Sequence, residues 1–251
     1  MPICKGARLK IKRANKHIAE LEGRIDGLRE RLVTTAHVDT NSGLEYIECS
    51  FAGIEKREVL EELSTIIGDA VHNLKSALDH VWFETVSRLI PSGDWERTRF
   101  PVYPRNNLES ALRNLQIDVS SPYLFRFIVG QIKPYDGGDW AIWPVHKLDI
   151  RDKHRLLIPF IHYSSISGIQ LEDQYGEVHT RDTWATTAFP YYVNLAGDLH
   201  IKDPGRASCT VMFEHGDAAT GMSVADALHF YSDHIFMIVE LFEEFTEAWG
   251  R

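Results

Sequence analysis

The sequence predicts an α+β fold: a helical bundle closed by long N- and C-terminal helices, with an antiparallel β-sheet inserted into it or packed on it. Three observations lead to this class. Apolar residues recur at helical spacing in 11–32 and in 224–249. A third, longer helical pattern covers about 57–89. Aromatic and β-branched runs separated by turns fill about 156–213, which is typical of antiparallel strands.

The two end helices show the alternating spacing of three and four residues that defines a heptad seam. Their seams consist of Ile11, Ala14, Ile18, Leu21, Ile25, Leu28 and Leu32, and of Val224, Leu228, Tyr231, Ile235, Ile238, Phe242, Phe245 and Trp249. In a parallel homodimer through the first seam, Arg24 would face Arg29 of the other chain, and these like charges are unfavourable. The last helix instead offers acidic residues to a basic neighbour. We therefore expect the end helices to pair within the chain, and a homodimer is the second use of the seam.

Local signals predict the elements between the end helices. Turn-forming residues at 39–43 precede an apolar strand, Leu44–Phe51, and indicate a hairpin. The helix at 57–89 stops before Pro91, whose ring cannot continue it. Shorter helices are expected near 107–117, 122–132 and 144–154, and strands at 156–163, 191–195 and 209–213. We expect one domain over 1–251, with helical parts at 1–155 and 220–251 and a β-rich part at 156–215.

Composition limits the class of protein. The 251 residues are 44 % apolar, which is enough to build a core. The first residues lack the apolar run of a signal peptide, and no stretch reaches the roughly 18 apolar residues of a membrane span. The three cysteines, Cys4, Cys49 and Cys209, are odd in number and form no Cys-x-x-Cys pair. These features predict a cytoplasmic protein that does not enter a membrane.

Charge is distributed unevenly along the chain. The net charge is −9, yet residues 1–34 hold nine lysines and arginines against four acidic residues, so the remainder is strongly acidic. An acidic body argues against a broad non-specific surface for nucleic acid. A local basic site for a phosphate backbone is still compatible with this balance.

The helix predicted around 66–82 carries two opposed stripes. The apolar stripe consists of Leu63, Ile67, Ala70, Leu74, Ala77, Leu78 and Val81, and the polar stripe of Asp69, His72, Asn73, Ser76 and His80. Two imidazoles, a carboxylate, an amide and a hydroxyl on one arc suit acid/base chemistry or metal binding. A structural interpretation stays open, because Asp69 with His72 and Lys75 with Asp79 have the spacing of ordinary helical pairs.

A second polar cluster, 149–155, ends the helix that precedes the β-rich part. Basic side chains at a helix C-terminus stabilise the last carbonyl groups, and this capping role is one interpretation. The functional interpretation is an anion site, in which Asp152, Lys153, His154 and Arg155 lie beside the polar stripe.

Two kinds of chemistry fit these residues. A divalent transition metal would use Asp69, His72 and His80, with Asp152 and His154 as added ligands, although no Glu-x-x-His occurs. Metal-free cleavage of RNA needs an imidazole that moves the proton of the 2′-hydroxyl and a fixed cation for the phosphate, and His80 with Lys75 supplies that pair. Nucleophilic catalysis is poorly supported, since neither a Gly-x-Ser-x-Gly elbow nor a glycine-rich phosphate loop is found.

The chain also resembles a group of bacterial proteins without an established activity. The resemblance spans roughly 55–160 and rests on the strings Ile67-Gly68-Asp69-Ala70-Val71-His72-Asn73-Leu74-Lys75-Ser76-Ala77-Leu78-Asp79-His80, Phe100-Pro101-Val102, Gln131-Ile132-Lys133-Pro134-Tyr135 and Asp152-Lys153-His154-Arg155. In that group the helical motif reads Gly-Asp-x-x-His-Asn-Leu-Arg-Ser-Ala-Leu-Asp-His.

A more distant resemblance is to the HEPN superfamily, helical-bundle proteins of which many are metal-independent RNases in toxin or defence systems. Their motif is Arg, four to six residues, then His, and 75–80 has this spacing with Lys75 in place of Arg. Lysine does not reproduce the planar, bidentate phosphate contact of arginine. HEPN enzymes commonly build their site across a dimer, which the first seam would permit.

The sequence therefore favours a HEPN-like, metal-independent ribonuclease or RNA-binding relative. In it His80 is the acid/base, Lys75 the phosphate partner, His72 and Asn73 orienting groups, and Asp69, Ser76 and 152–155 binding groups. The alternatives are a divalent-metal site at Asp69, His72 and His80, and a non-catalytic domain that binds a ligand or a protein.

Overall fold

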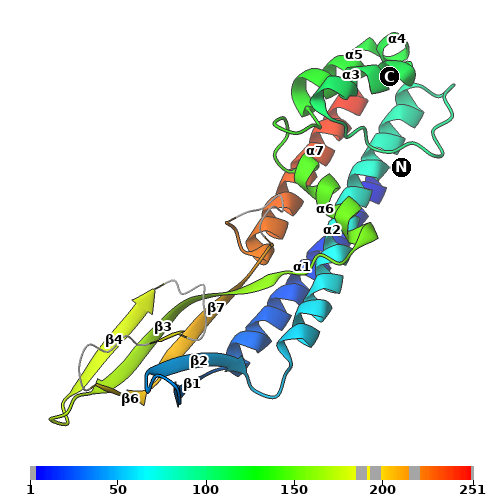
Figure 1. Cartoon of the computed structure of the whole chain (residues 1–251). Helices are drawn as coiled ribbons and strands as arrows, with labels where there is room; N and C mark the ends of the chain where they lie inside the picture. Colours follow the sequence, from blue (N-terminus) through cyan, green and yellow to red (C-terminus); the bar gives the residue numbers. More distant parts are fainter. Residues whose placement is uncertain (1–3, 185–190, 193–198, 215–220, 250–251) are drawn as a thin grey trace. The chain divides into compact units, whose positions relative to one another are not determined.

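The α+β class is confirmed by the computed structural model, which describes residues 4–184, 191–192, 199–214 and 221–249 (Figure 1). The helices are α1 (Lys5–Arg31), α2 (Lys56–Leu89), α3 (Arg105–Asn114), α4 (Ile117–Ser120), α5 (Pro122–Phe127), the π-helical turn η1 (Ile128–Ile132), α6 (Ile142–His154) and α7 (Val224–Trp249). The strands are β1 (Leu32–Val38), β2 (Glu45–Phe51), β3 (Phe160–Glu172), β4 (Val178–Trp184), β5 (Tyr191–Tyr192), β6 (His200–Asp203) and β7 (Arg206–Met212).

The chain divides into two compact units. The helical unit consists of the described residues up to Leu21, of Ser64–Leu157, and of those from Phe213 onward. The β-rich unit consists of Glu22–Leu63 and Ile158–Met212. The expected boundary of the helical part, 1–155, therefore differs from the structure at 22–63, which belongs to the β-rich unit. This stretch contains the last turns of α1, the hairpin β1–β2 and the first turns of α2. The single domain stays a prediction.

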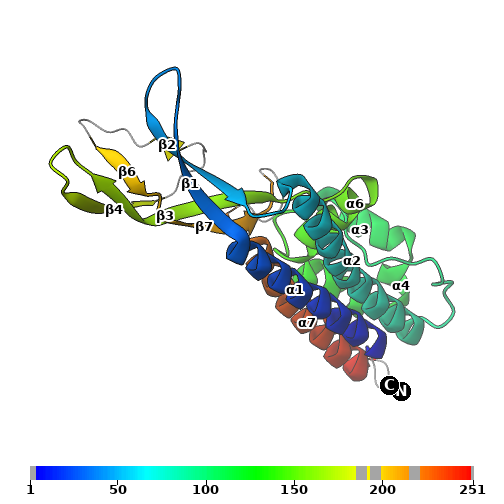
Figure 2. The same cartoon turned by 90° about the horizontal axis from the view of Figure 1, so that it is seen from below.

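In the helical unit, α1 and α7 lie side by side (Figure 2). Most residues of both apolar seams are buried, from Ile11 on α1 to Phe242 on α7, whereas Trp249 at the end of α7 is exposed and Leu32 belongs to β1. Polar contacts fix the pairing: Arg8 forms an ion pair with Glu243 at 2.6 Å, and the Ser232 hydroxyl donates to Asn15 at 2.5 Å. The expected pairing of the end helices is thus confirmed. The seam proposed for a homodimer is covered within the chain.

The long helix α2 also begins and ends close to the predicted positions. Pro91 follows its end at Leu89, as expected for a residue that cannot continue a helix. Its apolar stripe is fully buried, with Leu74, Ala77 and Leu78 at 0 % exposure. The Trp82 indole donates to the Thr98 hydroxyl at 2.8 Å, which secures the segment after α2 to the helix.

The β-rich unit is built from antiparallel strands. β1 and β2 form the expected hairpin, in register from the Leu32–Phe51 pair to the Val38–Glu45 pair, and β5 pairs with β2. β3 pairs with β4, with β7 through its first half and with β6 through its second. The hydrophobic core of the β-rich unit contains a cluster of Ile47, Ile166, Ile169 and Leu171.

The strand expected at 156–163 begins only at Phe160, since Pro159 has no N–H for a ladder hydrogen bond. The strand expected at 209–213 is β7, which starts three residues earlier and ends one residue earlier. Of the strand expected at 191–195, only 191–192 lie within the described residues. No helix in the described part of the chain is long and apolar enough to cross a membrane.

Candidate functional site

The polar stripe of α2 lies beside α6, and one contact joins the two helices. The Nδ1 atom of His72 lies 3.0 Å from the Oδ1 atom of Asp149. Asp149 is only 3 % exposed, whereas the side chain of His72 is 53 % exposed. A buried carboxylate thus fixes an imidazole whose other edge is open to solvent.

This contact sets the role of each ring nitrogen of His72. When Nδ1 carries the hydrogen and donates it to Asp149, Nε2 holds a free lone pair. Nε2 lies 3.5 Å from the Ser76 hydroxyl one turn along α2, at the limit of a hydrogen bond. The arrangement leaves Nε2 able to accept a proton, because Asp149 stabilises the imidazolium that forms.

Asp149 also pairs with a lysine of its own helix. The ammonium group of Lys153, one turn further along α6, donates to the Oδ2 atom of Asp149. The Lys153 side chain is about half exposed, and His154 and Arg155 follow it at the exposed end of α6. Arg151 instead pairs with Glu214 at 2.7 Å. Three consecutive residues with basic side chains, 153–155, therefore lie at the end of the helix that carries Asp149.

Asp152 reaches α2 at a glycine. Its carboxylate packs against Gly68 so closely that a Cβ atom on Gly68 would overlap it. Burial raises the pKa of Asp152, and the negative charges of Asp149 and Asp69 raise it further. Gly68 is therefore needed for the close approach of α6, which explains the Gly-Asp pair at the start of the polar motif.

Lys75 does not occupy the position expected of a phosphate ligand. It is buried at 5 % exposure and forms an ion pair with Asp79 at 2.5 Å. The same oxygen of Asp79 accepts the backbone N–H of Phe100 at 2.8 Å. The structural interpretation of this pair is confirmed: Lys75 neutralises a carboxylate that holds the Phe100 segment.

His80 belongs to another part of the helical unit. A Cβ atom placed on Gly6 would lie 2.8 Å from its Nδ1 atom, so His80 packs against the start of α1. Five residues along a helix turn the side chain by about 140°, which separates His80 from Lys75 around α2. The expected pair of His80 and Lys75 in one site is not formed.

The alternative metal ligands are not brought together either. His72 and His80 are two turns apart, about 12 Å along the axis of α2. Within the described residues, Asp69, His72 and His80 do not form a group with ligand atoms close enough to hold one ion, and neither do Asp152 and His154 with them. The one group that meets this criterion there is Asp173, Glu177 and His179, in the β3–β4 connection and the start of β4.

Asn73 has a local partner. Its amide donates to the backbone carbonyl of Asp69 at 2.8 Å, within the same helix. Asp69 itself is exposed. The amide of Asn73, expected to help orient the acid/base, is thus used within α2.

The sequence analysis placed Asp149 at the start of the second polar cluster without giving it a role in the site, and it did not consider His146. His146, Asp149 and Lys153 follow the three- and four-residue spacing of one face of α6, and this signal was available in the sequence. Among the described residues, the buried Nδ1 atom of His146 has no hydrogen-bond partner. Burial lowers the pKa of His146, and the nearby charge of Lys75 lowers it further.

Comparison with protein-family models, with curated proteins and with solved structures finds no match to this chain.

Proposed function

We propose that this chain is a HEPN-like, metal-independent endoribonuclease, or an RNA-binding relative of such an enzyme, with His72 as its acid/base. The observation that supports this most is the hydrogen bond from an exposed imidazole to a buried carboxylate, Asp149. A base oriented in this way suits proton transfer that needs no metal.

The reaction needs little more than a base and a cation. Nε2 of His72 takes the proton of an RNA 2′-hydroxyl, the 2′-oxygen attacks the adjacent phosphorus, and the bond from phosphorus to the 5′-oxygen breaks. The leaving 5′-oxygen takes a proton from a water molecule, and the imidazolium of His72 returns its proton to the hydroxide that remains, so the products are a 2′,3′-cyclic phosphate and a 5′-hydroxyl. The basic side chains of 153–155 supply positive charge for the phosphate.

The acid/base is thus His72 and not His80, which the sequence favoured. Lys75 is enclosed and paired, so the spacing of 75–80 that resembles the HEPN motif gives the proposal little support. The exposed end of α6 offers a cationic group in its place. A cytoplasmic location and a role in a toxin or defence system are parts of the same proposal; the three free cysteines fit a reducing compartment. A homodimer would use a surface other than the covered seam of α1.

The test compares two histidines on one helix. Purified full-length protein is incubated with a mixed RNA pool in excess EDTA, together with His72→Gln and His80→Gln variants whose folding is checked by circular dichroism. We expect cleavage by the parent and by His80→Gln, and a loss of about 100-fold or more in His72→Gln. Cleavage that depends on His80 and not on His72 would contradict the proposed roles, and no cleavage by the parent would contradict an RNase.

A further inference from the structure

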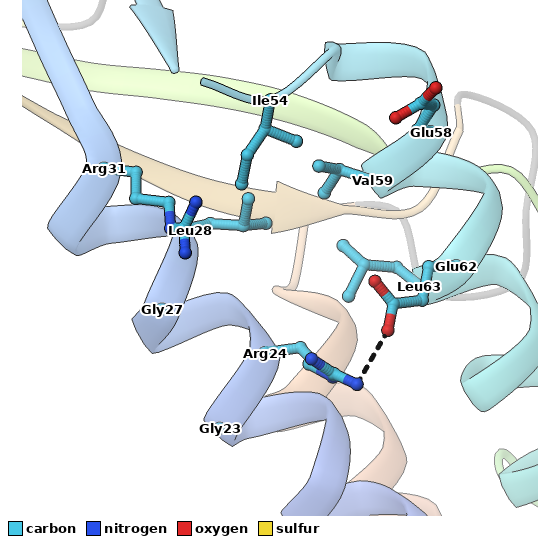
Figure 3. A pocket seen from close by; sticks show the side chains of 10 residues that line it. All are labelled: Gly23, Arg24, Gly27, Leu28, Arg31, Ile54, Glu58, Val59, Glu62 and Leu63. Carbon is cyan, nitrogen blue, oxygen red and sulfur yellow. Dashed lines mark ion pairs between the residues drawn. The ribbon is translucent and has the colours of Figure 1, made fainter. Parts of the chain in front are cut away.

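The β-rich unit contains a hollow of about 270 Å³ between the last turns of α1 and the first turns of α2 (Figure 3). All residues that line it lie within 22–63, so it is separate from the site at His72. Its volume is just below that of typical pockets for drug-sized ligands. The hollow is therefore large enough for a small molecule and too small for a folded segment of another chain.

Two glycines keep this hollow open. Gly23 and Gly27 lie one turn apart within α1, where each glycine costs about 1 kcal/mol relative to alanine. At Gly6 and Gly68 a Cβ atom would collide with a neighbouring side chain, which explains why those positions are glycine. At Gly23 and Gly27 a Cβ atom would meet nothing within 4 Å. Packing within the chain thus gives no reason for them, whereas a ligand in the hollow does.

The wall of the hollow is apolar. Leu28 of α1 and Val59 and Leu63 of α2 point into the space between the two helices (Figure 3). Aliphatic side chains of this kind bind an aliphatic body through its apolar surface. The ligand therefore has an apolar part.

The charged residues at the rim of the hollow determine which polar group the ligand carries. Arg24 and Glu62 form an ion pair at 2.9 Å that spans the gap between the helices, so the charge of Arg24 is compensated. Within the described residues, the guanidinium of Arg31 has no ion pair or side-chain hydrogen bond, and it lies beside Leu28 (Figure 3). Guanidinium binds a carboxylate through two parallel hydrogen bonds.

The remaining charges exclude larger anions. Glu58 lines the α2 side of the hollow and repels a phosphate or a dicarboxylate more strongly than a single carboxylate, whereas the charge of Glu62 is compensated by Arg24.

We propose that this hollow binds a small aliphatic carboxylate, with its carboxylate on Arg31 and its chain in the space above Gly23 and Gly27. The hollow is thus a ligand site of the β-rich unit, independent of catalysis at His72.

The test uses hexanoate as the probe, titrated into the full-length protein by isothermal calorimetry. We expect saturable binding at one site. Arg31→Gln should weaken it about tenfold or more, because a charge-assisted contact is lost. Gly27→Leu should abolish it, because the side chain fills the hollow, and leucine favours a helix more than glycine does. Arg57→Gln is the matched control, since Arg57 is exposed, pairs with Glu61 and does not line the hollow.

Hexan-1-ol tests the charge separately, and we expect it to bind at least tenfold more weakly than hexanoate. The proposal is overturned if hexanoate does not bind saturably, if hexan-1-ol binds as tightly, or if a Gly27→Leu variant with an unchanged circular dichroism spectrum keeps its affinity. Gly23→Leu provides a second variant that fills the same space.

Discussion

The helical unit and the β-rich unit differ in where they keep polar side chains. In the described part of the chain, the buried polar or charged residues all belong to the helical unit: His17, Ser64, Lys75, Thr85, Asp149, Ser232 and Thr246. The buried residues of the β-rich unit are apolar there, and its ion pairs, such as Lys202 with Glu172, are partly exposed. Buried polar contacts thus add to apolar packing in the helical unit, whereas the described part of the β-rich unit is held by apolar packing alone in its interior.

The largest effect that follows from this contrast is at Lys75. In Lys75→Met, Asp79 keeps the Phe100 N–H but loses its cation, and we expect the free energy of unfolding to fall by about 3 kcal/mol. In Lys202→Met, which breaks an exposed pair of the β-rich unit, we expect a loss of no more than about 1 kcal/mol. Urea unfolding of both variants measures the difference. Equal losses would remove the contrast between the units.

A smaller effect separates two helical glycines, one in each unit. Gly68→Ala should destabilise the protein by about 1–3 kcal/mol, because the new Cβ atom overlaps Asp152. Gly27→Ala should stabilise it by up to about 1 kcal/mol, because its Cβ atom meets nothing.

Thermal unfolding of the two glycine variants gives the sign of each change. The double variant Gly68→Ala with Asp152→Ala should recover most of the loss, since it removes the group that the methyl strikes. A loss that persists in the double variant would assign the effect to something other than this contact.

The smallest effect concerns pH and His146. Its pKa is lower in the folded chain than in the unfolded chain, where it is about 6.5. As the pH falls below about 6.5, the unfolded chain therefore binds the proton first, and the folded state loses stability. His146→Gln should lose less stability between pH 7.5 and 5.5 than the parent, as measured by urea unfolding at both values. An identical loss in the variant would show that His146 does not contribute.

The elements that the sequence predicted best depend on local periodicity. The seams of α1 and α7 repeat every three or four residues, so their buried faces can be identified without knowing the partner. The π-helical turn at Ile128–Ile132 and the late start of β3 were not predicted, because they depend on details of backbone geometry. The grouping of 22–63 with β3 and β7 depends on contacts between distant residues, which periodicity does not reveal.

The site was predictable in part for the same reason. The stripe of α2 correctly placed His72 on the polar face, and Lys75 with Asp79 is a local pair that spacing alone suggests. The partner of His72 is 77 residues away, and nothing local connects them. His80 was preferred because of its spacing from Lys75, yet spacing does not show that the two side chains point to different sides of the helix.

The pairing of α1 with α7 also affects how the chain is made. Arg8 and its partner Glu243 are separated by 235 positions. At a synthesis rate of about 5–20 residues per second, α1 leaves the ribosome on the order of 10–50 s before α7 is complete. Throughout this interval the heptad seam of α1 lacks the helix that later pairs with it, so its apolar surface is exposed to association with other chains.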